Sequence, residues 1–170
     1  SDVCSSDLAE IAMRRLIENC FPHPGVIGEE FPATREDAEY VWVLDPIDGT
    51  KSFISGFPTW GTLIGLTHRG RPCYGMMHQP FTREKFFGDG VKASLRVPNG
   101  ERILKARACA SLKDATLSCT SPTMFNEQEL IAFKRVENAA RLTRYGFDCY
   151  AYCMVAAGFM DLVIESNLKP

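Results

Sequence analysis

The first part of the chain repeats apolar residues with the period of an α-helix. Between residues 8 and 20 they recur at i, i+3 and i+4, while charged side chains occupy the opposite face. We therefore predict a helix from Leu8 to Cys20. Asp7 is positioned to cap its start, and Pro22 stops it.

The middle of the chain consists of short apolar runs separated by turn residues. The runs at 40–44, 62–67, 73–78 and 84–88 are rich in β-branched, aromatic and other apolar side chains. A turn at Gly70-Arg71-Pro72 joins the second run to the third. This pattern predicts a buried strand at 40–44 followed by an antiparallel meander.

Beyond a polar stretch at 96–105 the pattern changes to alternating strands and helices. Strands are expected at 116–119, 141–145 and 159–165, and helices at 127–136 and 149–157. Gly158 is a natural C-terminal cap for the last helix. The inward-facing candidates on the helix at 127–136 are Leu130, Ile131 and Phe133.

These elements predict an α/β fold class, an α+β layered sandwich with alternating helix and sheet layers. We expect a metal- and phosphate-binding α+β subdomain at residues 9–105 and a partial α/β subdomain at 106–170.

Composition excludes several classes of protein. At 45% hydrophobic and 24% charged residues the chain is typical of soluble globular proteins, and no apolar run approaches the ~20 residues that span a bilayer. The net charge of −2 lacks the excess of positive charge that is typical of proteins that bind nucleic acid or an anionic membrane surface. The seven cysteines are odd in number and form no CxxC pair, which favours a cytoplasmic location. Cys149 and Cys153 share a predicted helix, but no further Cys or His stands at ligand spacing.

The strongest candidate chemistry is the hexapeptide Asp-Pro-Ile-Asp-Gly-Thr at residues 45–50, directly after a buried strand. Two carboxylates, a glycine and a hydroxyl suit a hard cation and a phosphate better than they suit packing. A turn through Pro46 and Ile47 can aim Asp45 and Asp48 at one point, with the Ile47 carbonyl as a further oxygen.

Glu29, within Gly28-Glu29-Glu30, can approach the same point from a neighbouring element. Taken singly, each of these residues also has a structural explanation as a helix cap, a turn residue or a solvated charge. Their combination favours a site for Mg²⁺, which prefers oxygen ligands.

Together these motifs resemble the inositol monophosphatase superfamily of Mg²⁺-dependent phosphatases. Within it, the chain is most similar to bacterial histidinol-phosphatases of the inositol-monophosphatase type. The segments that carry the resemblance are 28–30, 42–53, 57–62, 120–122, 145–152, 161–165 and 168–170.

The resemblance implies a role for each residue of the site. Mg²⁺ would be bound by Glu29, Asp45, the Ile47 carbonyl and Asp48. Glu29 and Thr50 would orient and activate the attacking water.

The resemblance also implies how the substrate is held. The amides of Gly49 and Thr50 would bind phosphate, and Asp148 and Glu165 would contact the rest of the substrate. Acidic residues there suit a cationic amino alcohol. Simpler explanations stay open, with Asp148 as the N-cap before Cys149 and Glu165 as a solvated strand end.

The function implied is hydrolysis of a small phosphate monoester, histidinol phosphate, in histidine biosynthesis. Inositol 1-phosphate and a nucleotide 3′-phosphate are alternative substrates, and the family also allows a homodimer. Residues 1–8 do not match the family and are expected to be a non-native leader. The family's last metal-binding aspartate would follow Pro170, so an inactive fragment is a third alternative.

Overall fold

A computed structural model describes residues 4–168 of the chain. Its first helix, α1, runs from Ser5 to Cys20. Phe21, directly before Pro22, is the C-cap residue. The helix begins at Ser5, earlier than the predicted Leu8, and Cys4 is its N-cap residue, so Asp7 contributes to capping as the third helical residue of a capping box and not as the N-cap itself. Asp7 lies in the first turn instead, where its Oδ2 accepts a hydrogen bond from the Cys4 amide at 3.2 Å.

Seven strands form the first sheet, in sequence order from β1 to β7. Only β1 and β2 are parallel, and the following pairs are antiparallel, so the predicted meander is confirmed. The polar stretch at 96–105 contributes to the last hairpin. The strands are β1 (Gly25–Gly28), β2 (Tyr40–Asp48), β3 (Gly61–His68), β4 (Arg71–Gln79), β5 (Glu84–Gly88), β6 (Ala93–Val97) and β7 (Gly100–Ile103).

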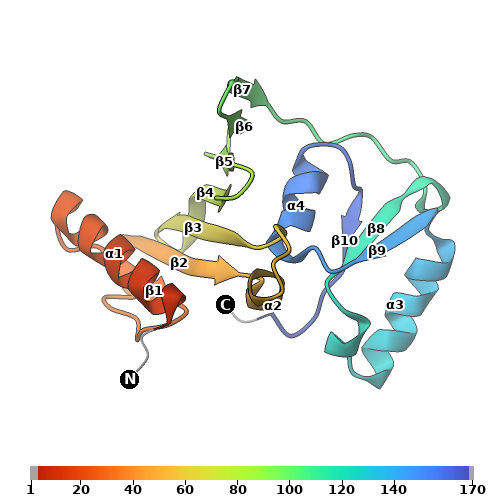
Figure 1. Cartoon of the computed structure of the whole chain (residues 1–170), viewed down its shortest axis with the longest axis horizontal. Helices are drawn as coiled ribbons and strands as arrows, with labels where there is room; N and C mark the ends of the chain where they lie inside the picture. Colours follow the sequence, from red (N-terminus) through yellow and green to blue (C-terminus); the bar gives the residue numbers. More distant parts are fainter. Residues whose placement is uncertain (1–3, 169–170) are drawn as a thin grey trace.

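Helices cover both faces of this sheet. Successive side chains of a strand point to opposite faces. Accordingly Ile64 of β3 packs with Ile17 of α1, whereas its neighbour Leu63 packs with Cys149 and Cys153 of α4 (Asp148–Ala156). Figure 1 shows α4 between the first sheet and the second.

The second sheet has three parallel strands in the order β10-β8-β9. Helix α3 (Glu127–Ala139) packs on it through Phe133, which is 2% exposed. Leu130 joins this core, but the inward placement expected for Ile131 is wrong, since its side chain is 57% exposed. The strands are β8 (Thr116–Cys119), β9 (Leu142–Tyr145) and β10 (Leu162–Val163), and the short helices are α2 (Thr50–Ile54), η1 (Leu112–Asp114) and η2 (Pro122–Met124).

Strand β10 is shorter than the predicted strand at 159–165. After α4 the chain turns at Gly158, which has a left-handed φ of 80°. The amides of Phe159 and Met160 then donate to the carbonyl of Met154, so these residues close the helix instead of extending a strand.

The layers therefore alternate as α1, first sheet, α4, second sheet and α3 (Figure 1), which confirms the α/β layered fold. Cys149 and Cys153 belong to α4 and lie in the core between this helix and the first sheet, and burial raises the pKa of both thiols. Both therefore act as packing residues. Among residues 4–168, no helix combines the length and apolar character needed to cross a membrane.

Candidate metal and phosphate site

An irregularity in β2 aims its two aspartates at one side of the first sheet. Asp45 pairs with Leu63 and Asp48 pairs with Gly61, so two residues of β2 stand opposite the single residue Thr62 of β3. In a regular strand, side chains three positions apart face opposite sides, and the extra residue of a bulge restores them to the same side.

This differs from the expectation that the strand ends at Leu44 and the motif follows it, because β2 continues to Asp48. Pro46 has no N–H for the ladder, which makes a bulge the natural position for a proline inside a sheet. The Pro46 carbonyl instead accepts a hydrogen bond from Thr62 Oγ1 at 2.8 Å.

A cavity of about 570 Å³ opens beside this bulge, between the first sheet and α4. Five of the predicted site residues line it, although they come from four separate parts of the chain. They are Glu29, Asp45, Asp48, Asp148 and Glu165.

Asp45 is the most perturbed member of this group. Burial raises the pKa of its carboxyl well above the ordinary value, and the negative charges of Glu29 and Asp48 raise it further. Its buried Oδ1 has no hydrogen-bond partner among residues 4–168. Mutual repulsion around an unpartnered carboxylate oxygen is the condition that a divalent cation relieves.

The donor set therefore fits Mg²⁺ in its chemistry. Within residues 4–168, no three Asp, Glu, His or Cys side chains already converge in the arrangement of a metal centre. The carboxylates share one cavity and one electrostatic environment.

The turn that presents Glu29 is held by Glu10, a fully buried carboxylate of α1. Glu10 Oε2 accepts a hydrogen bond from the Glu30 amide at 2.8 Å, and its Oε1 accepts one from Arg14 Nε at 2.7 Å. The approach is so close that a Cβ atom at Gly28 would lie 1.9 Å from Glu10 Oε1. The helix thus fixes the backbone on both sides of Glu29.

Gly49 and Thr50 lie at the start of α2, outside the lining of this cavity. Thr50 Oγ1 donates to the Ile47 carbonyl at 3.2 Å, so the predicted catalytic hydroxyl contacts the predicted carbonyl ligand. Gly49 has a left-handed φ of 81°, and a Cβ atom there would lie 2.9 Å from Asp148 Cβ. Glycine is required at this position both by conformation and by the contact with Asp148.

Asp148 is not the N-cap of α4. Phe147 is the N-cap residue, and the Cys149 amide donates to Asp48 Oδ2 at 2.9 Å. The Asp148 carboxylate instead accepts a hydrogen bond from Ser52 Oγ at 2.5 Å. Burial raises the pKa of Asp148, the Ser52 hydrogen bond opposes this shift, and the charges of Asp48 and Glu165 add to it.

Glu165 is not a solvated strand end either. Its Oε1 accepts hydrogen bonds from the amide and the hydroxyl of Thr120, and its Oε2 accepts one from the Tyr152 hydroxyl at 2.7 Å. Burial and the Glu165 carboxylate raise the pKa of Tyr152, which keeps that hydroxyl protonated. Glu165 therefore reaches the cavity as an ordered group.

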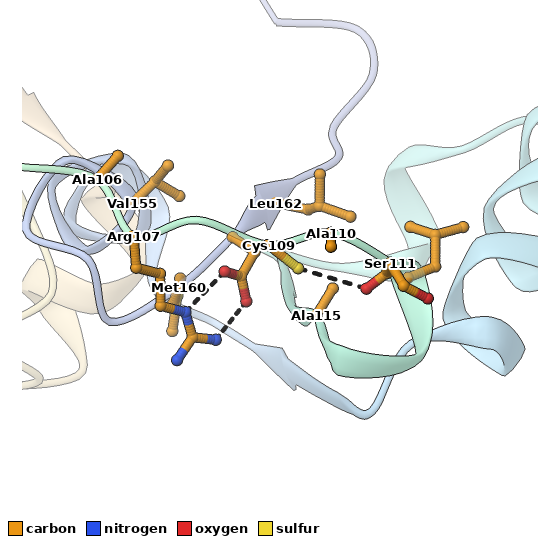
Figure 2. A pocket seen from close by; sticks show the side chains of 11 residues that line it. Ala106, Arg107, Cys109, Ala110, Ser111, Ala115, Val155, Met160 and Leu162 are labelled. Carbon is orange, nitrogen blue, oxygen red and sulfur yellow. Dashed lines mark hydrogen bonds and ion pairs between the residues drawn. The ribbon is translucent and has the colours of Figure 1, made fainter.

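A second cavity, of about 430 Å³, lies where the segment before η1 passes the end of α4 (Figure 2). Its one cationic side chain, Arg107, pairs with Asp161 through two hydrogen bonds. The Arg107 guanidinium holds the pKa of Asp161 at about 2. The remaining lining is mostly Ala, Leu and other apolar residues, so this cavity offers no free charge for catalysis.

Comparison with known proteins settles the family. A sequence model of the inositol monophosphatase family matches residues 4–170, so residues 4–8 match the family although they were expected to lie outside it. The chain belongs to the inositol monophosphatase family. Several of its relatives are named as phosphatases, and the fold described above is that of its solved members.

Relatives within the inositol monophosphatase family carry more than one activity in their names. The chain is 46% identical to the bifunctional phosphatase IMPL2, chloroplastic, of Arabidopsis thaliana, over 98% of this chain and 48% of the plant protein. It is 32% identical to the histidinol-phosphatase of Mycobacterium tuberculosis, over 94% of this chain and 63% of that protein. A solved inositol monophosphatase from Zymomonas mobilis superposes with a TM-score of 0.85 at 40% identity, covering 94% of this chain and 60% of that one. The chain thus spans between about half and just under two thirds of these relatives.

Four polar residues of the site were not assigned a role from the sequence. Tyr152 and Thr120 hold Glu165, Ser52 holds Asp148, and Glu10 holds the turn beside Glu29. Of these four, only Glu10 has a recognisable pattern in the sequence. It stands four residues before Arg14 on a predicted helix, at the spacing of an ion pair.

Proposed function

We propose that this protein is a Mg²⁺-dependent phosphomonoesterase whose metal is held by Glu29, Asp45, the Ile47 carbonyl and Asp48. The observation that carries the proposal is the buried Oδ1 of Asp45, which has no hydrogen-bond partner among residues 4–168 and belongs to a carboxyl that the charges of Glu29 and Asp48 also act on. When bound, Mg²⁺ supplies positive charge that polarises a phosphoryl group and lowers the pKa of water.

The chain's own groups would perform the remaining tasks. Glu29, held by the turn that Glu10 supports, would accept the proton of the attacking water. Thr50 would orient that water from the start of α2, and the amides of Gly49 and Thr50 would bind phosphate oxygens. The in-line attack would then release the alcohol and inorganic phosphate.

For the substrate we propose histidinol phosphate. Asp148 and Glu165 give the cavity two carboxylates beyond those assigned to metal, and a cationic amino alcohol complements them. The similarity to the M. tuberculosis histidinol-phosphatase supports this choice. The net charge of −2 likewise favours a small phosphate monoester over a nucleic acid as partner.

Inositol 1-phosphate is the second candidate, favoured by the 40% identity to the Z. mobilis inositol monophosphatase. A neutral polyol can donate hydrogen bonds to the carboxylates of Asp148 and Glu165 but gains no ion pair there. The two candidates therefore differ in how strongly they depend on the charges of these two residues.

Steady-state hydrolysis of both esters by the protein from the complete gene tests the proposal. We expect a higher kcat/KM for histidinol phosphate, reduced at least tenfold by Asp148→Asn or Glu165→Gln, with a smaller effect on inositol 1-phosphate. Faster turnover of inositol 1-phosphate would exclude the histidinol phosphate assignment. Metal binding is tested separately by comparing Tm with and without Mg²⁺, since a ligand that binds the folded state raises Tm. The same two measurements on the 170-residue chain test the inactive-fragment alternative, which predicts neither turnover nor a Mg²⁺-dependent Tm.

A further inference from the structure

Three side chains form a hydrogen-bonded chain from the loop after α2 to the cavity. Thr59 Oγ1 donates to Ser52 Oγ at 2.9 Å, and Ser52 Oγ donates to Asp148 Oδ2 at 2.5 Å. Thr59 Oγ1 also lies 3.4 Å from the Gly146 carbonyl, on the segment that leads into α4. The chain therefore joins the α2 loop to the residues that precede α4.

The carboxylate fixes the direction of these hydrogen bonds. An ionised Asp148 can only accept, so the single hydroxyl proton of Ser52 must point to it. Ser52 Oγ is then left as an acceptor, and Thr59 must donate to it. The Ser52 proton is thus committed to the carboxylate, and the shorter of the two contacts of the Thr59 hydroxyl is the one to Ser52.

Asp148 is held in an uncommon backbone conformation at the same point. Its φ of 45° is left-handed, a region that aspartate visits more readily than most residues. Such residues persist where the surroundings over-determine them, and they concentrate at functional sites. Here the surroundings are Ser52, which binds Oδ2, and Gly49, where a Cβ atom would lie 2.9 Å from the Asp148 Cβ.

We propose that Ser52 and Thr59 are positioning residues that aim the Asp148 carboxylate at the non-phosphate group of the substrate. The inference rests on the proposed contact between Asp148 and that group. Ser52 holds Oδ2, which leaves Oδ1 available to bind the substrate. Loss of either hydroxyl frees the carboxylate to rotate and weakens substrate binding, while the metal and phosphate groups stay in place.

A split between KM and kcat tests this role in the protein from the complete gene. Ser52→Ala and Thr59→Val each raise KM for histidinol phosphate about tenfold and leave kcat within about twofold, because Ser52→Ala removes the hydrogen bond to the carboxylate, Thr59→Val removes the donor that orients Ser52, and no reacting group is touched. Thr59→Ser restores the wild-type KM, since it keeps the hydroxyl. The rise in Tm caused by Mg²⁺ is unchanged in all three variants.

Thr67→Val is the matched control, because Thr67 Oγ1 donates to the Val41 carbonyl within the first sheet at 3.3 Å, away from the cavity. It removes a hydroxyl of the same kind and leaves both kinetic constants unchanged. If Thr67→Val shifts KM as much as Thr59→Val does, the effect is general destabilisation and the positioning role is wrong.

A double-mutant cycle separates this inference from the proposed substrate. If Ser52 acts through Asp148, adding Ser52→Ala to Asp148→Asn raises KM no further than Asp148→Asn alone. Additive effects of the two changes would overturn the positioning role. The cycle is run on whichever ester the wild type hydrolyses faster, so a preference for inositol 1-phosphate would refute the substrate and still decide the coupling.

Discussion

Asp48 Oδ2 accepts a hydrogen bond from the backbone amide of Cys149 at 2.9 Å, across 101 residues of sequence. Asp48 closes β2 of the first sheet, and Cys149 lies in the first turn of α4. One carboxylate therefore satisfies an N-terminal amide of the helix between the two sheets and also faces the candidate metal site. Stability and chemistry are coupled at this residue.

Two substitutions at Asp48 separate these roles. In Asp48→Asn the amide oxygen still accepts from Cys149, so we expect the unfolding free energy to fall by less than about 1 kcal/mol while Mg²⁺-dependent turnover falls at least 100-fold. Asp48→Ala leaves the buried amide unsatisfied and costs about 1–3 kcal/mol in addition. Urea denaturation and phosphate release measure the two effects. Equal stability of the two variants would show that the hydrogen bond to Cys149 contributes nothing.

Glu10 predicts a link between the stability of α1 and the metal site. Replacing Glu10 by Ala leaves Arg14, whose side chain is 14% exposed, without its carboxylate, and removes the acceptor for the Glu30 amide. Breaking a buried pair in this way costs about 3 kcal/mol. We also expect the variant to need more Mg²⁺ for half-maximal activity, because the turn carrying Glu29 loosens.

Glu18→Ala is the control for Glu10→Ala, since Glu18 is exposed on the same helix. It changes helix propensity and charge by the same amounts without touching the turn. A similar Mg²⁺ requirement in both variants would contradict the proposed support of Glu29 by Glu10.

Gly49→Ala tests whether the contact with Asp148 matters beyond backbone conformation. Gly49 and Gly70 both have left-handed φ angles, of 81° and 74°. A Cβ atom at Gly49 meets Asp148 at 2.9 Å, whereas one at Gly70 meets nothing within 4 Å. Gly70→Ala should therefore cost only the conformational term of about 1 kcal/mol. Gly49→Ala should cost clearly more in denaturant unfolding and abolish turnover, and equal costs would refute the steric argument.

The sequence predicted the elements whose pattern is local. Helix α1, the meander and the alternation of α3 and α4 with parallel strands follow from periodicity and turn residues. Ile131 was misplaced because a helix of mixed composition allows more than one inward face, and only packing against the sheet selects Phe133. The motif at residues 45–50 indicated a cation site, but the bulge that aims its aspartates requires the register of β3.

The hydroxyl groups that hold the site carboxylates could not be predicted from the sequence, because they lie far from their partners along the chain. Ser52 meets Asp148 from 96 residues away, and Thr120 meets Glu165 from 45 residues away. Serine and threonine hydroxyls have no pattern that names a distant partner, so only the packing of α4 between the two sheets brings these pairs together. Asp148 and Glu165 were predicted from family resemblance, and their ordered hydrogen bonds exclude the helix-cap and solvated explanations.

Asp161 predicts a stability loss at low pH, independent of catalysis. Its side chain is 2% exposed and binds Arg107 and the Thr116 amide, and its pKa is lowered from 3.8 to about 2. A lowered folded-state pKa stabilises the protein above the unfolded value, so this contribution is complete above about pH 4 and is lost as pH falls toward 2. Because Arg107 is 37% exposed and partly screened, we expect a contribution of about 1 kcal/mol.

Urea denaturation between about pH 6 and pH 2 measures this contribution of Asp161. Asp161→Asn should lower the unfolding free energy at neutral pH and flatten its decline below about pH 4. Arg107→Gln removes the same ion pair through its other partner, so it should also flatten the decline of the unfolding free energy below about pH 4. The double variant should be hardly less stable than either single variant. A decline as steep in both variants as in the wild type would assign the acid sensitivity to other carboxylates.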